Sequence, residues 1–483
     1  MTTIPLLIGG VETAASNGAV LTRRNPVSGA VVTTAAAATV ADAEAAVAAA
    51  AAAFPAWSAR GPNDRRSILL KAADLMEATG DTFVANMMSE TGSTREWAAS
   101  NVHEAAKMIR EAASLVTQIA GQVIPSDIPG SFSMAARAPV GVCLGIAPWN
   151  APIILGTRAI AMPLACGNTV VLKASEICPA VHHLIGDVFQ RAGCASGVVN
   201  VISNAPADAA AIVDALISHP KVKRINFTGS TRVGRLIAEK AGRLLKPVLL
   251  ELGGNAPMVV LDDADIDSSV DAAVFGAFMH QGQICMSTER IVVDESIADV
   301  FVPKFAARAS ALSVGDPMKS NATLGAMVDV AAAERITTLV EDARSKGAKI
   351  VAGGERDGAL MAATVIDRVT PKMRIYHEES FGPVTTIVRV RGVEEAIATA
   401  NDTEFGLSAA VFGKDITRAM EVAGRIESGI CHINGPTVED EPQMPFGGTK
   451  SSGYGRFGGL AGIAEFTELR WLTIQKDKRQ YPF

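Results

Sequence analysis

The sequence Gly141-Val-Cys-Leu-Gly-Ile146 is a short apolar run, and a second run of the same kind follows at 169–173. Such runs continue to residue 251, with segments of helical length and spacing between them; the runs lie at 198–202, 222–227 and 248–251, and the helical segments at 178–192, 207–218 and 231–242. Apolar strands that alternate with helices predict a parallel sheet covered on both faces, the doubly wound arrangement. Ligands of such sheets bind beyond the carboxyl ends of the strands.

A second alternating series begins after Pro257 and predicts a second α/β domain. Its strands and helices are expected at 258–261, 267–279, 291–293, 299–312, 332–346, 349–351, 385–390 and 393–401. We place the boundary near Gly253-Gly254, which gives a first domain of residues 1–117 and 137–252 and a second of 253–443. Residues 118–136 and 460–483 fit neither domain and are expected to form a projecting β-arm that pairs between subunits.

The segment before the first sheet is expected to be mixed. Residues 6–11 and 19–23 predict a hairpin with Asn17-Gly18 at its turn. An Ala-rich helix follows at 39–53 with Thr39 as its cap, and further helices are expected at 63–78, at 81–90 and from near Thr94, the last carrying Trp97.

Composition excludes several classes of protein. The 483 residues carry a net charge of -6 and are 48% hydrophobic and 19% charged, which is typical of a compact globular protein with more than one domain. No basic run indicates nucleic acid as a partner, no apolar run is long enough to cross a bilayer, and the N-terminus lacks signal-peptide features. Six cysteines without paired spacing favour a reducing cytoplasm.

Three polar residues at sharp breaks are candidates for chemistry. Asn150 follows one strand, Glu251 ends another, and Cys285 lies on the loop that Gly282 begins after a helix. A nucleophile, a base and an amide donor are the minimum for acyl chemistry on a carbonyl. Taken singly, each has an ordinary structural explanation: a buried thiol, a salt-bridged carboxylate and an Asx turn between prolines.

The sequence resembles the aldehyde dehydrogenase superfamily over essentially its whole length. Seven motifs in family order carry the resemblance: Pro148-Trp-Asn-Ala-Pro152, Gly167-Asn-Thr-Val-Val-Leu-Lys-Ala-Ser175, Phe227-Thr-Gly-Ser-Thr231, Glu251-Leu-Gly-Gly254, Gly282-Gln-Ile-Cys285, Glu378-Glu-Ser-Phe-Gly-Pro383 and Pro445-Phe-Gly-Gly448. The resemblance implies a Rossmann-like NAD-binding first domain, a catalytic second domain and an oligomerisation arm. It also implies that the Cys285 thiolate attacks the aldehyde, that Asn150 and the Cys285 backbone N–H hold the alkoxide, and that Glu251 activates the water that hydrolyses the thioester.

The cofactor implied by the resemblance is NAD. No G-x-G-x-x-G follows the first strand of the sheet, and the expected pyrophosphate contact is instead Ser230 at a helix N-terminus. Glu176 would repel a 2′-phosphate and so favours NAD over NADP. The expected cofactor residues are Ile146, Pro148, Trp149, Lys173, Ser175, Glu176, Gly229, Ser230, Leu252, Glu379 and Phe381. Ile202-Ser-Asn-Ala-Pro206 departs from the glycine-rich turn of relatives, which leaves the contacts there in doubt.

Substrate residues are carried over from the family in the same way. They are Trp97, Ala151, Leu155, Arg158, Ile284, Met286, Val438 and Phe446, an apolar set with one cation. Asn150-Ala-Pro with Arg158 resembles the branch that acts on aromatic aldehydes such as salicylaldehyde, an intermediate of naphthalene breakdown, and vanillin. An aromatic ring suits the Trp and Phe walls, and Arg158 is expected to face a ring hydroxyl or phenolate. The alternative is a succinate-semialdehyde-type enzyme, because Arg158 also suits a carboxylate.

The same residues bear on two other classes of protein, on metal binding and on the oligomeric state. A CoA-acylating enzyme is disfavoured by Glu251, and a non-enzymatic, crystallin-like relative is disfavoured by the presence of Cys285, Glu251 and Asn150. We expect no metal, because His182-His183 lack a second ligand pair and the acidic run 262–267 lacks the Gly and Glu of a calcium loop. The resemblance and the arm imply a homodimer or homotetramer.

Overall fold

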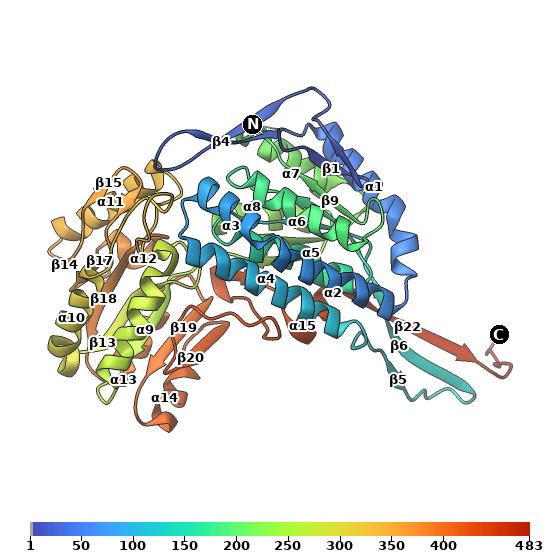
Figure 1. Cartoon of the computed structure of the whole chain (residues 1–483). Coiled ribbons are helices and arrows are strands. Elements are labelled where there is room, and N and C mark those ends of the chain that lie inside the picture. The colour runs from blue at the N-terminus through green and yellow to red at the C-terminus, as the bar shows by residue number, and fades with distance from the viewer. Residues whose placement is uncertain (1–2) are drawn as a thin grey trace.

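The computed structural model describes residues 3–483 and contains two large sheets, each flanked by helices (Figure 1). The first is an 8-stranded sheet in the order β2-β1-β9-β8-β7-β10-β11-β21. Its strands are β1 (Leu6–Ile8), β2 (Val11–Thr13), β7 (Val142–Ile146), β8 (Thr169–Lys173), β9 (Val199–Ile202), β10 (Val222–Thr228), β11 (Val248–Glu251) and β21 (Gly453–Tyr454). The five strands from β9 to β11 are parallel, which confirms the predicted α/β fold.

Helices cover both faces of this sheet because its strands are apolar on both faces. Cys143 and Leu144 are adjacent on β7, yet they pack into different hydrophobic clusters on opposite sides. One side is covered by α2 (Pro62–Ala78), α4 (Arg95–Leu115), α5 (Pro152–Ala165) and α6 (Pro179–Ala192), and the other by α1 (Val40–Ser58), α7 (Ala209–Ser218) and α8 (Thr231–Arg243). Thr39 and Asp42 form a capping box at the start of α1, as the pattern predicts. Helix α3 (Gly80–Thr91) packs between α4 and α6.

The second sheet is 7-stranded, in the order β14-β17-β18-β13-β12-β19-β20. Its strands are β12 (Ala256–Val260), β13 (Thr288–Asp294), β14 (Lys349–Ala352), β17 (Thr364–Asp367), β18 (Val384–Val390), β19 (Ser408–Phe412) and β20 (Ile430–Ile433), and its helices are α9 (Ile266–Phe278), α10 (Glu295–Ser310), α11 (Val330–Ser345), α12 (Arg374–His377), α13 (Gly392–Asn401) and α14 (Ile416–Ala423). The chain passes from the first sheet to the second between Glu251 and Ala256. Short elements complete the chain: β15 (Arg356–Asp357), β16 (Leu360–Met361), η1 (Pro206–Asp208), η2 (Met279–Gly282), η3 (Lys450–Ser452) and α15 (Gly459–Glu465).

The predicted N-terminal hairpin is wrong. Gly18 does turn the chain with φ +70°, but the strands beside it pair elsewhere: β2 pairs with β1, and β3 (Val20–Arg24) pairs with β4 (Val31–Ala36). The β1–β2 hairpin turns at Gly9-Gly10, because both residues adopt positive φ and β1 is held at the sheet edge by β9.

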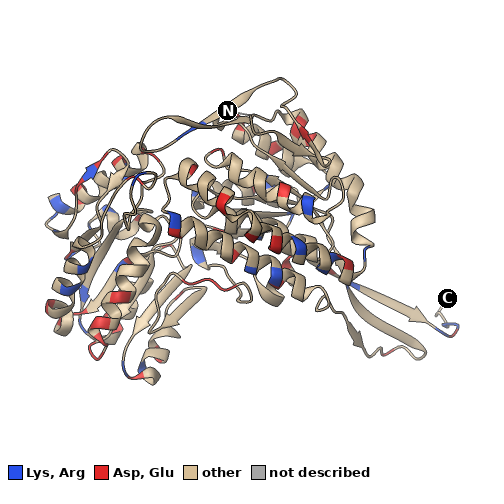
Figure 2. Cartoon of the chain, in the orientation of Figure 1, with Lys and Arg blue, Asp and Glu red and all other residues tan. Residues whose placement is uncertain are grey.

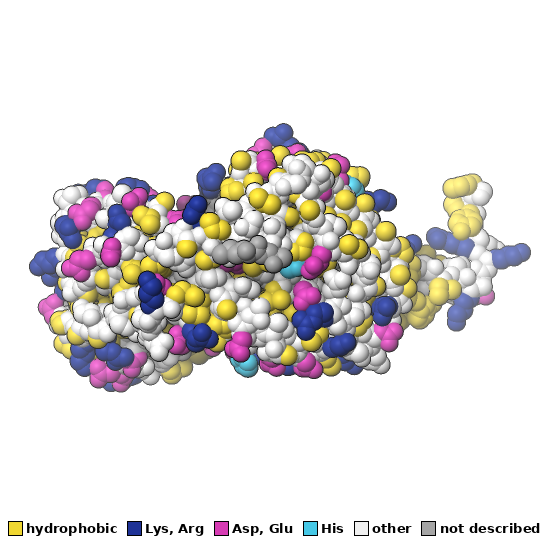
Figure 3. Space-filling model, turned by 45° about the horizontal axis from the view of Figure 1, so that its top comes forward, with side chains coloured by type: hydrophobic (Ala, Val, Ile, Leu, Met, Phe, Trp, Pro, Cys, Tyr) yellow, Lys and Arg dark blue, Asp and Glu magenta, His cyan; other side chains and the backbone are white. Residues whose placement is uncertain are grey.

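A three-stranded arm projects from the body (Figures 1 and 3). β22 (Thr467–Gln475) pairs antiparallel with β6 (Ser131–Pro139), and β5 (Gln122–Ile124) lies on the other side of β6. Apolar side chains on the arm are exposed, among them Trp471 at 79%. Acidic and basic side chains are interspersed over the rest of the chain (Figure 2). In residues 3–483, no helix is both long enough and apolar enough to cross a membrane.

Candidate active site

The strand order creates a crevice between β7 and β10. The chain starts at β7, moves outward through β8 to β9, and then returns to the other side of β7 at β10. The helices that follow β7 and β10 therefore lie on opposite faces, and loops at the carboxyl ends of these strands diverge. Asn150 follows β7, Ser230 follows β10, and Glu251 ends β11 beside Thr228 of β10. The sequence thus brings its polar residues to a ligand-binding edge.

The loop that carries Cys285 begins with a left-handed turn. Helix α9 ends at Phe278, and His280, Gln281 and Gly282 adopt φ of 49°, 55° and 66°. Non-glycine residues adopt this conformation at a cost, so the surrounding contacts must hold it. Gln281 donates from Nε2 to the Ala326 carbonyl at 2.9 Å. This turn directs the chain away from the helix and leaves Cys285 on a loop rather than in a core.

Glycines bring the Glu251 loop against the Cys285 loop. A Cβ added to Gly254 would lie 2.1 Å from the Cys285 carbonyl oxygen, so only glycine fits there. Two cavities meet at this contact, and Asn150, Leu155, Glu251 and Cys285 line both of them. The three residues proposed for chemistry, far apart in the sequence, therefore converge on one junction.

Asn150 is oriented by two hydrogen bonds. Its Nδ2 donates to the Gln283 carbonyl at 2.9 Å, and its own carbonyl accepts from Trp97 Nε1 at 3.1 Å. Because a side-chain amide nitrogen has two hydrogens, the second one remains available to a ligand. Asn150 is 5% exposed and lines both cavities, so this donor lies in a site that is largely shielded from solvent.

Glu251 and Cys285 perturb each other in a buried site. Burial raises the pKa of Glu251 to about 7, and the Cys285 thiol opposes this rise. Burial also raises the pKa of Cys285 well above its usual value, and the Glu251 carboxylate adds to that rise. Neither Glu251 oxygen has a well-formed hydrogen bond in the described chain. The pair therefore consists of a protonated thiol beside a carboxyl group able to exchange a proton near neutral pH.

The first of the two cavities, the Trp149 cavity, has a volume of about 270 Å³. It is lined by Pro148, Trp149, Asn150, Leu155, Thr228, Gly229, Ser230, Glu251, Leu252, Gly253, Cys285, Glu379 and Phe381. It includes seven of the expected cofactor residues. Phe381 meets Trp149 edge to face at 5.8 Å, and Glu379 accepts a 2.8 Å hydrogen bond from the Gly254 N–H. The cavity opens at the N-terminus of α8, where Ser230 caps the helix and backbone N–H groups suit an anion.

The remaining expected cofactor residues lie outside the Trp149 cavity. Ile146 and Lys173 are register partners at the ends of β7 and β8, and Ser175 and Glu176 follow β8. Lys173 forms a 3.0 Å ion pair with Glu176. Burial opposes ionisation of Glu176, but Lys173 outweighs it and lowers the pKa of that carboxyl. Glu176 is therefore ionised and paired with Lys173 at the edge of the sheet, two strands away from β10.

The second cavity, the Trp97 cavity, has a volume of about 200 Å³. It is lined by Trp97, Ser100, Glu104, Asn150, Ala151, Ile154, Leu155, Glu251, Phe275, Met279, Ile284, Cys285, Met286, Val438, Glu439, Asp440 and Phe446. Seven of the eight expected substrate residues are among them. The Trp97 ring stacks on the His280 ring with centroids 5.1 Å apart. Because His280 belongs to the left-handed turn, that turn also fixes the orientation of Trp97 in the cavity wall.

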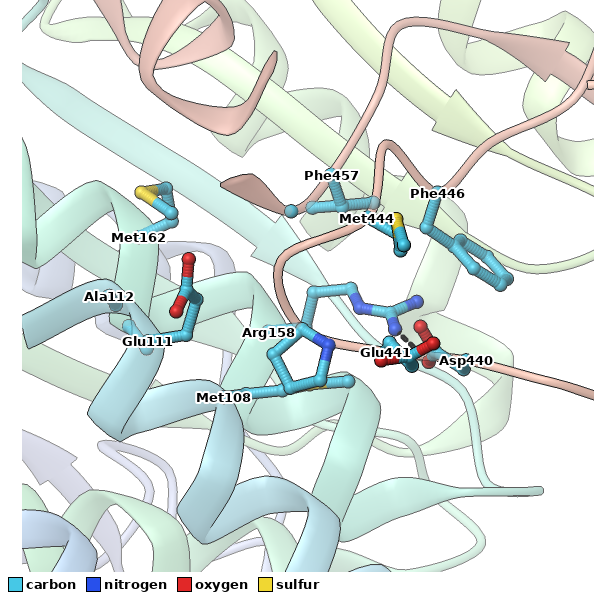
Figure 4. Close-up of a pocket in the computed structure, with 13 residues that line it drawn as sticks. Met108, Glu111, Ala112, Arg158, Met162, Asp440, Glu441, Met444, Phe446 and Phe457 are labelled. Carbon is cyan, nitrogen blue, oxygen red and sulfur yellow. Dashed lines mark hydrogen bonds and ion pairs between the residues drawn. The ribbon is translucent and has the colours of Figure 1, made fainter. Parts of the chain in front are cut away.

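Arg158, the eighth, is not on the Trp97 cavity. Its guanidinium forms an ion pair with Asp440 and lies 4.4 Å from the centre of the Phe446 ring (Figure 4). It lines a neighbouring pocket with Met108 and Met162 instead. The expectation that Arg158 faces the substrate remains a prediction. Asp440, 282 positions later in the chain, takes its charge, yet the guanidinium still opposes the rise in pKa that burial causes in Glu251 and Cys285.

Sequence reasoning missed the acidic rim of the Trp97 cavity. Glu104, Glu439 and Asp440 supply its charged groups, and the run Val438-Glu-Asp-Glu441 was the available signal. No lysine, arginine or histidine stands among the described residues that line this cavity. Across residues 3–483, no three side chains of His, Cys, Asp or Glu gather as a metal site would require.

Comparison with known proteins agrees with this site. The aldehyde dehydrogenase family model matches residues 13–472. The chain is 60% identical to a vanillin dehydrogenase of Pseudomonas fluorescens over 100% of both chains, and 53% identical to a salicylaldehyde dehydrogenase of Pseudomonas putida over 99% of both. The crystal structure of a salicylaldehyde dehydrogenase from Pseudomonas putida G7 complexed with salicylaldehyde is 52% identical, covers 100% of both chains and superimposes with a TM-score of 0.99. The chain therefore belongs to the aldehyde dehydrogenase family, in the branch that contains the vanillin and salicylaldehyde dehydrogenases.

Proposed function

We propose that the chain oxidises an aromatic aldehyde, salicylaldehyde or a close hydroxylated analogue such as vanillin, to the carboxylic acid with NAD. The observation that carries this proposal is the Trp97 cavity, which has aromatic walls and no lining cation. Of the three carboxylates of its acidic rim, Asp440 is paired with Arg158 and Glu104 with Lys107. An uncharged ring fits such walls, whereas a substrate with a carboxylate tail would find no lining cation to pair with. The pairing of Arg158 with Asp440 removes the only cation that favoured the succinate-semialdehyde alternative.

The first chemical step in this proposal uses Cys285 and Glu251. Glu251 accepts the thiol proton, and the sulfur attacks the aldehyde carbon to form a thiohemiacetal. Its oxygen would be held by the second Asn150 Nδ2 hydrogen and the Cys285 backbone N–H. Loss of one such donor typically costs ~10²–10³ in rate. NAD, when bound, would supply the hydride acceptor, and loss of hydride from the thiohemiacetal carbon would leave a thioester on Cys285.

Glu251 is also the proposed base for hydrolysis of the thioester. Glu251 first releases the thiol proton to solvent. It then removes a proton from water, which attacks the thioester carbon, and returns that proton to the departing thiolate as the acid leaves. A pKa of about 7 suits both transfers, because a base is most effective when its pKa lies near the working pH. This base also argues against a CoA-acylating reaction, in which water must not reach the thioester.

The Trp149 cavity is the proposed cofactor site. Ser230 and the α8 N-terminus suit the pyrophosphate, Glu379 and Phe381 the nicotinamide riboside, and Lys173 and Glu176 the adenosine ribose. The family generally uses NAD or NADP. The lowered pKa of Glu176 keeps its negative charge at neutral pH, which supports a preference for NAD because a 2′-phosphate would be repelled.

Relative kcat/KM for salicylaldehyde, vanillin, benzaldehyde and succinic semialdehyde tests the substrate proposal. We expect the aromatic aldehydes to exceed succinic semialdehyde by about 100-fold or more, since a carboxylate taken out of water without a paired cation costs several kcal/mol. The same panel with Trp97→Ala should lose more efficiency on the aromatic aldehydes than on succinic semialdehyde, beyond the loss common to both that follows from removing its hydrogen bond to Asn150. Preference for succinic semialdehyde would refute the proposal, and CoA-dependent thioester formation would replace it with the acylating reaction.

We propose the following organisation for the molecule. Residues 1–117 and 137–252 bind the cofactor, 253–443 carry the nucleophile, and 118–136 with 460–483 form the arm. The exposed apolar side chains of the arm support a homodimer or homotetramer, which sedimentation measures directly. Six free cysteines support a cytoplasmic location.

A further inference from the structure

A buried carboxylate holds the loop that carries Glu379 and Phe381. Glu289, on β13 and four residues after Cys285, is 6% exposed. It accepts hydrogen bonds from the backbone N–H of Ser380 at 2.7 Å and of Phe381 at 2.8 Å. Burial and the nearby Glu379 raise the pKa of Glu289, whereas the two backbone N–H groups favour its ionised form, in which both oxygens accept. Burial of a carboxylate is costly, so its presence here indicates that its two hydrogen bonds to the loop serve a function.

An arginine holds the same loop from its carbonyl side. Arg335, on the exposed face of α11, donates to the carbonyl of Glu379 at 3.2 Å and to the carbonyl of Ser380. These carbonyls belong to the same two peptide groups whose N–H groups bond Glu289. One pair of peptide planes is therefore fixed on both edges, by an anion on one side and a cation on the other.

The orientation of these planes decides where two cavity side chains lie. Phe381 has φ of +50°, a conformation that a phenylalanine does not hold without support. The loop is also pressed against the nucleophile loop, since a Cβ on Gly282 would lie 2.0 Å from the Gly382 carbonyl oxygen. A rotated peptide plane would therefore move Glu379 and Phe381 within the Trp149 cavity.

We propose that Glu289 and Arg335, the loop clamp, are positioning residues that set the orientation of Glu379 and Phe381 for cofactor binding. Neither residue lines the Trp149 cavity, so both act through the loop. The inference rests on the proposed use of NAD, and it names two residues outside the cofactor site on which the affinity for NAD depends.

The test is the Kd of NAD, measured by titration calorimetry on the full-length protein without aldehyde. In Glu289→Gln one oxygen still accepts, but the amide NH₂ faces the second N–H, so one bond to a charged acceptor is lost. We expect the Kd to rise about tenfold, the effect of losing one such bond. Arg335→Gln, on an exposed helix face where folding is secure, should raise the Kd about fivefold.

A matched control is Glu90→Gln. Glu90 is also a buried carboxylate and also accepts two backbone N–H groups, those of Ala180 and Val181 at the start of α6. It does not contact the 379–381 loop, so its replacement should leave the Kd of NAD within about twofold. A general effect of losing a buried charge would instead appear equally in both variants.

Two further measurements separate positioning from structural damage. Hydrolysis of p-nitrophenyl acetate, which acylates a thiol without hydride transfer, should continue in Glu289→Gln because Cys285 and Glu251 are untouched. The double variant Glu289→Gln/Arg335→Gln should weaken NAD binding by less than the product of the single effects, since both residues hold the same peptide planes.

The clamp and the proposed function fail in different ways. Unchanged NAD affinity in Arg335→Gln and Glu289→Gln, with a wild type that oxidises aldehydes, would overturn the clamp alone. Loss of ester hydrolysis in step with NAD affinity would also overturn it in favour of a structural role. A wild type that oxidises no aldehyde would remove the proposed function, whatever the variants do.

Discussion

Replacing Glu251 by glutamine should stabilise the protein and stop its turnover. The Glu251 side chain is 1% exposed, and neither of its oxygens has a well-formed hydrogen bond among residues 3–483. A carboxylate in this position is costly when charged, and glutamine has nearly the same shape without the charge. The variant therefore separates what the carboxylate contributes to chemistry from what it costs the fold.

The size of the effect follows from the pKa of Glu251, raised from 4.5 to about 7 by burial. Below pH 4.5 the folded and unfolded chains are both protonated, and there is no penalty. As pH rises from 4.5 to 7, the unfolded chain releases its proton first, so stability falls; above pH 7 the loss is constant at about 3 kcal/mol. Between pH 5 and pH 8 the wild type should lose roughly 2 kcal/mol relative to Glu251→Gln.

Thermal unfolding of both proteins at pH 5, 6.5 and 8 measures this difference, and the cost of burying the new amide cancels because it is common to all three. The Tm advantage of the variant should grow by about 2–4 °C from pH 5 to pH 8. In parallel, rapid mixing with NAD and an aromatic aldehyde should show one burst of NADH per site, slowed by loss of the base that takes the thiol proton, and then no turnover. A Tm difference independent of pH would refute the buried-charge reasoning, and normal steady-state turnover would remove the role of Glu251 as base.

Three more outcomes are expected. Cys285→Ala should abolish NADH formation while the Kd of NAD stays within about twofold; residual turnover would show another nucleophile. In the wild type, kcat should fall as pH drops through about 7, because the Glu251 carboxylate that activates water becomes protonated; a kcat independent of pH from 6 to 8 would contradict this. Glu176→Gln should improve kcat/KM for NADP about tenfold relative to NAD, as the cofactor ratio will show, and an unchanged ratio would exclude Glu176 as the discriminating charge.

Local patterns were enough to predict the fold class and to choose candidate catalytic residues that the structure brings to one junction. Apolar strands that alternate with helices can bury both faces only in a covered parallel sheet, and polar residues at the ends of such strands must meet at one edge. That reasoning brings Asn150 and Glu251 together, and the glycines near Glu251 and Cys285 allow the two loops to touch. The N-terminal hairpin failed because a turn signal at Gly18 says where the chain reverses but not which strands pair.

Only the tertiary structure shows which charged side chains pair with each other when they lie far apart in the sequence. Arg158 was expected to face the substrate, but Asp440 pairs with it, and the charged side chains that line the Trp97 cavity are acidic. Glu289 gave no sequence signal, because its partners are backbone N–H groups on a loop 91 and 92 positions away. By itself the sequence determined the family, the doubly wound sheet and the candidate trio Asn150, Glu251 and Cys285, which depend on local periodicity and short motifs. The structure decided which charges are paired and which remain free, because that depends on separations of a few ångströms between segments that no local pattern relates.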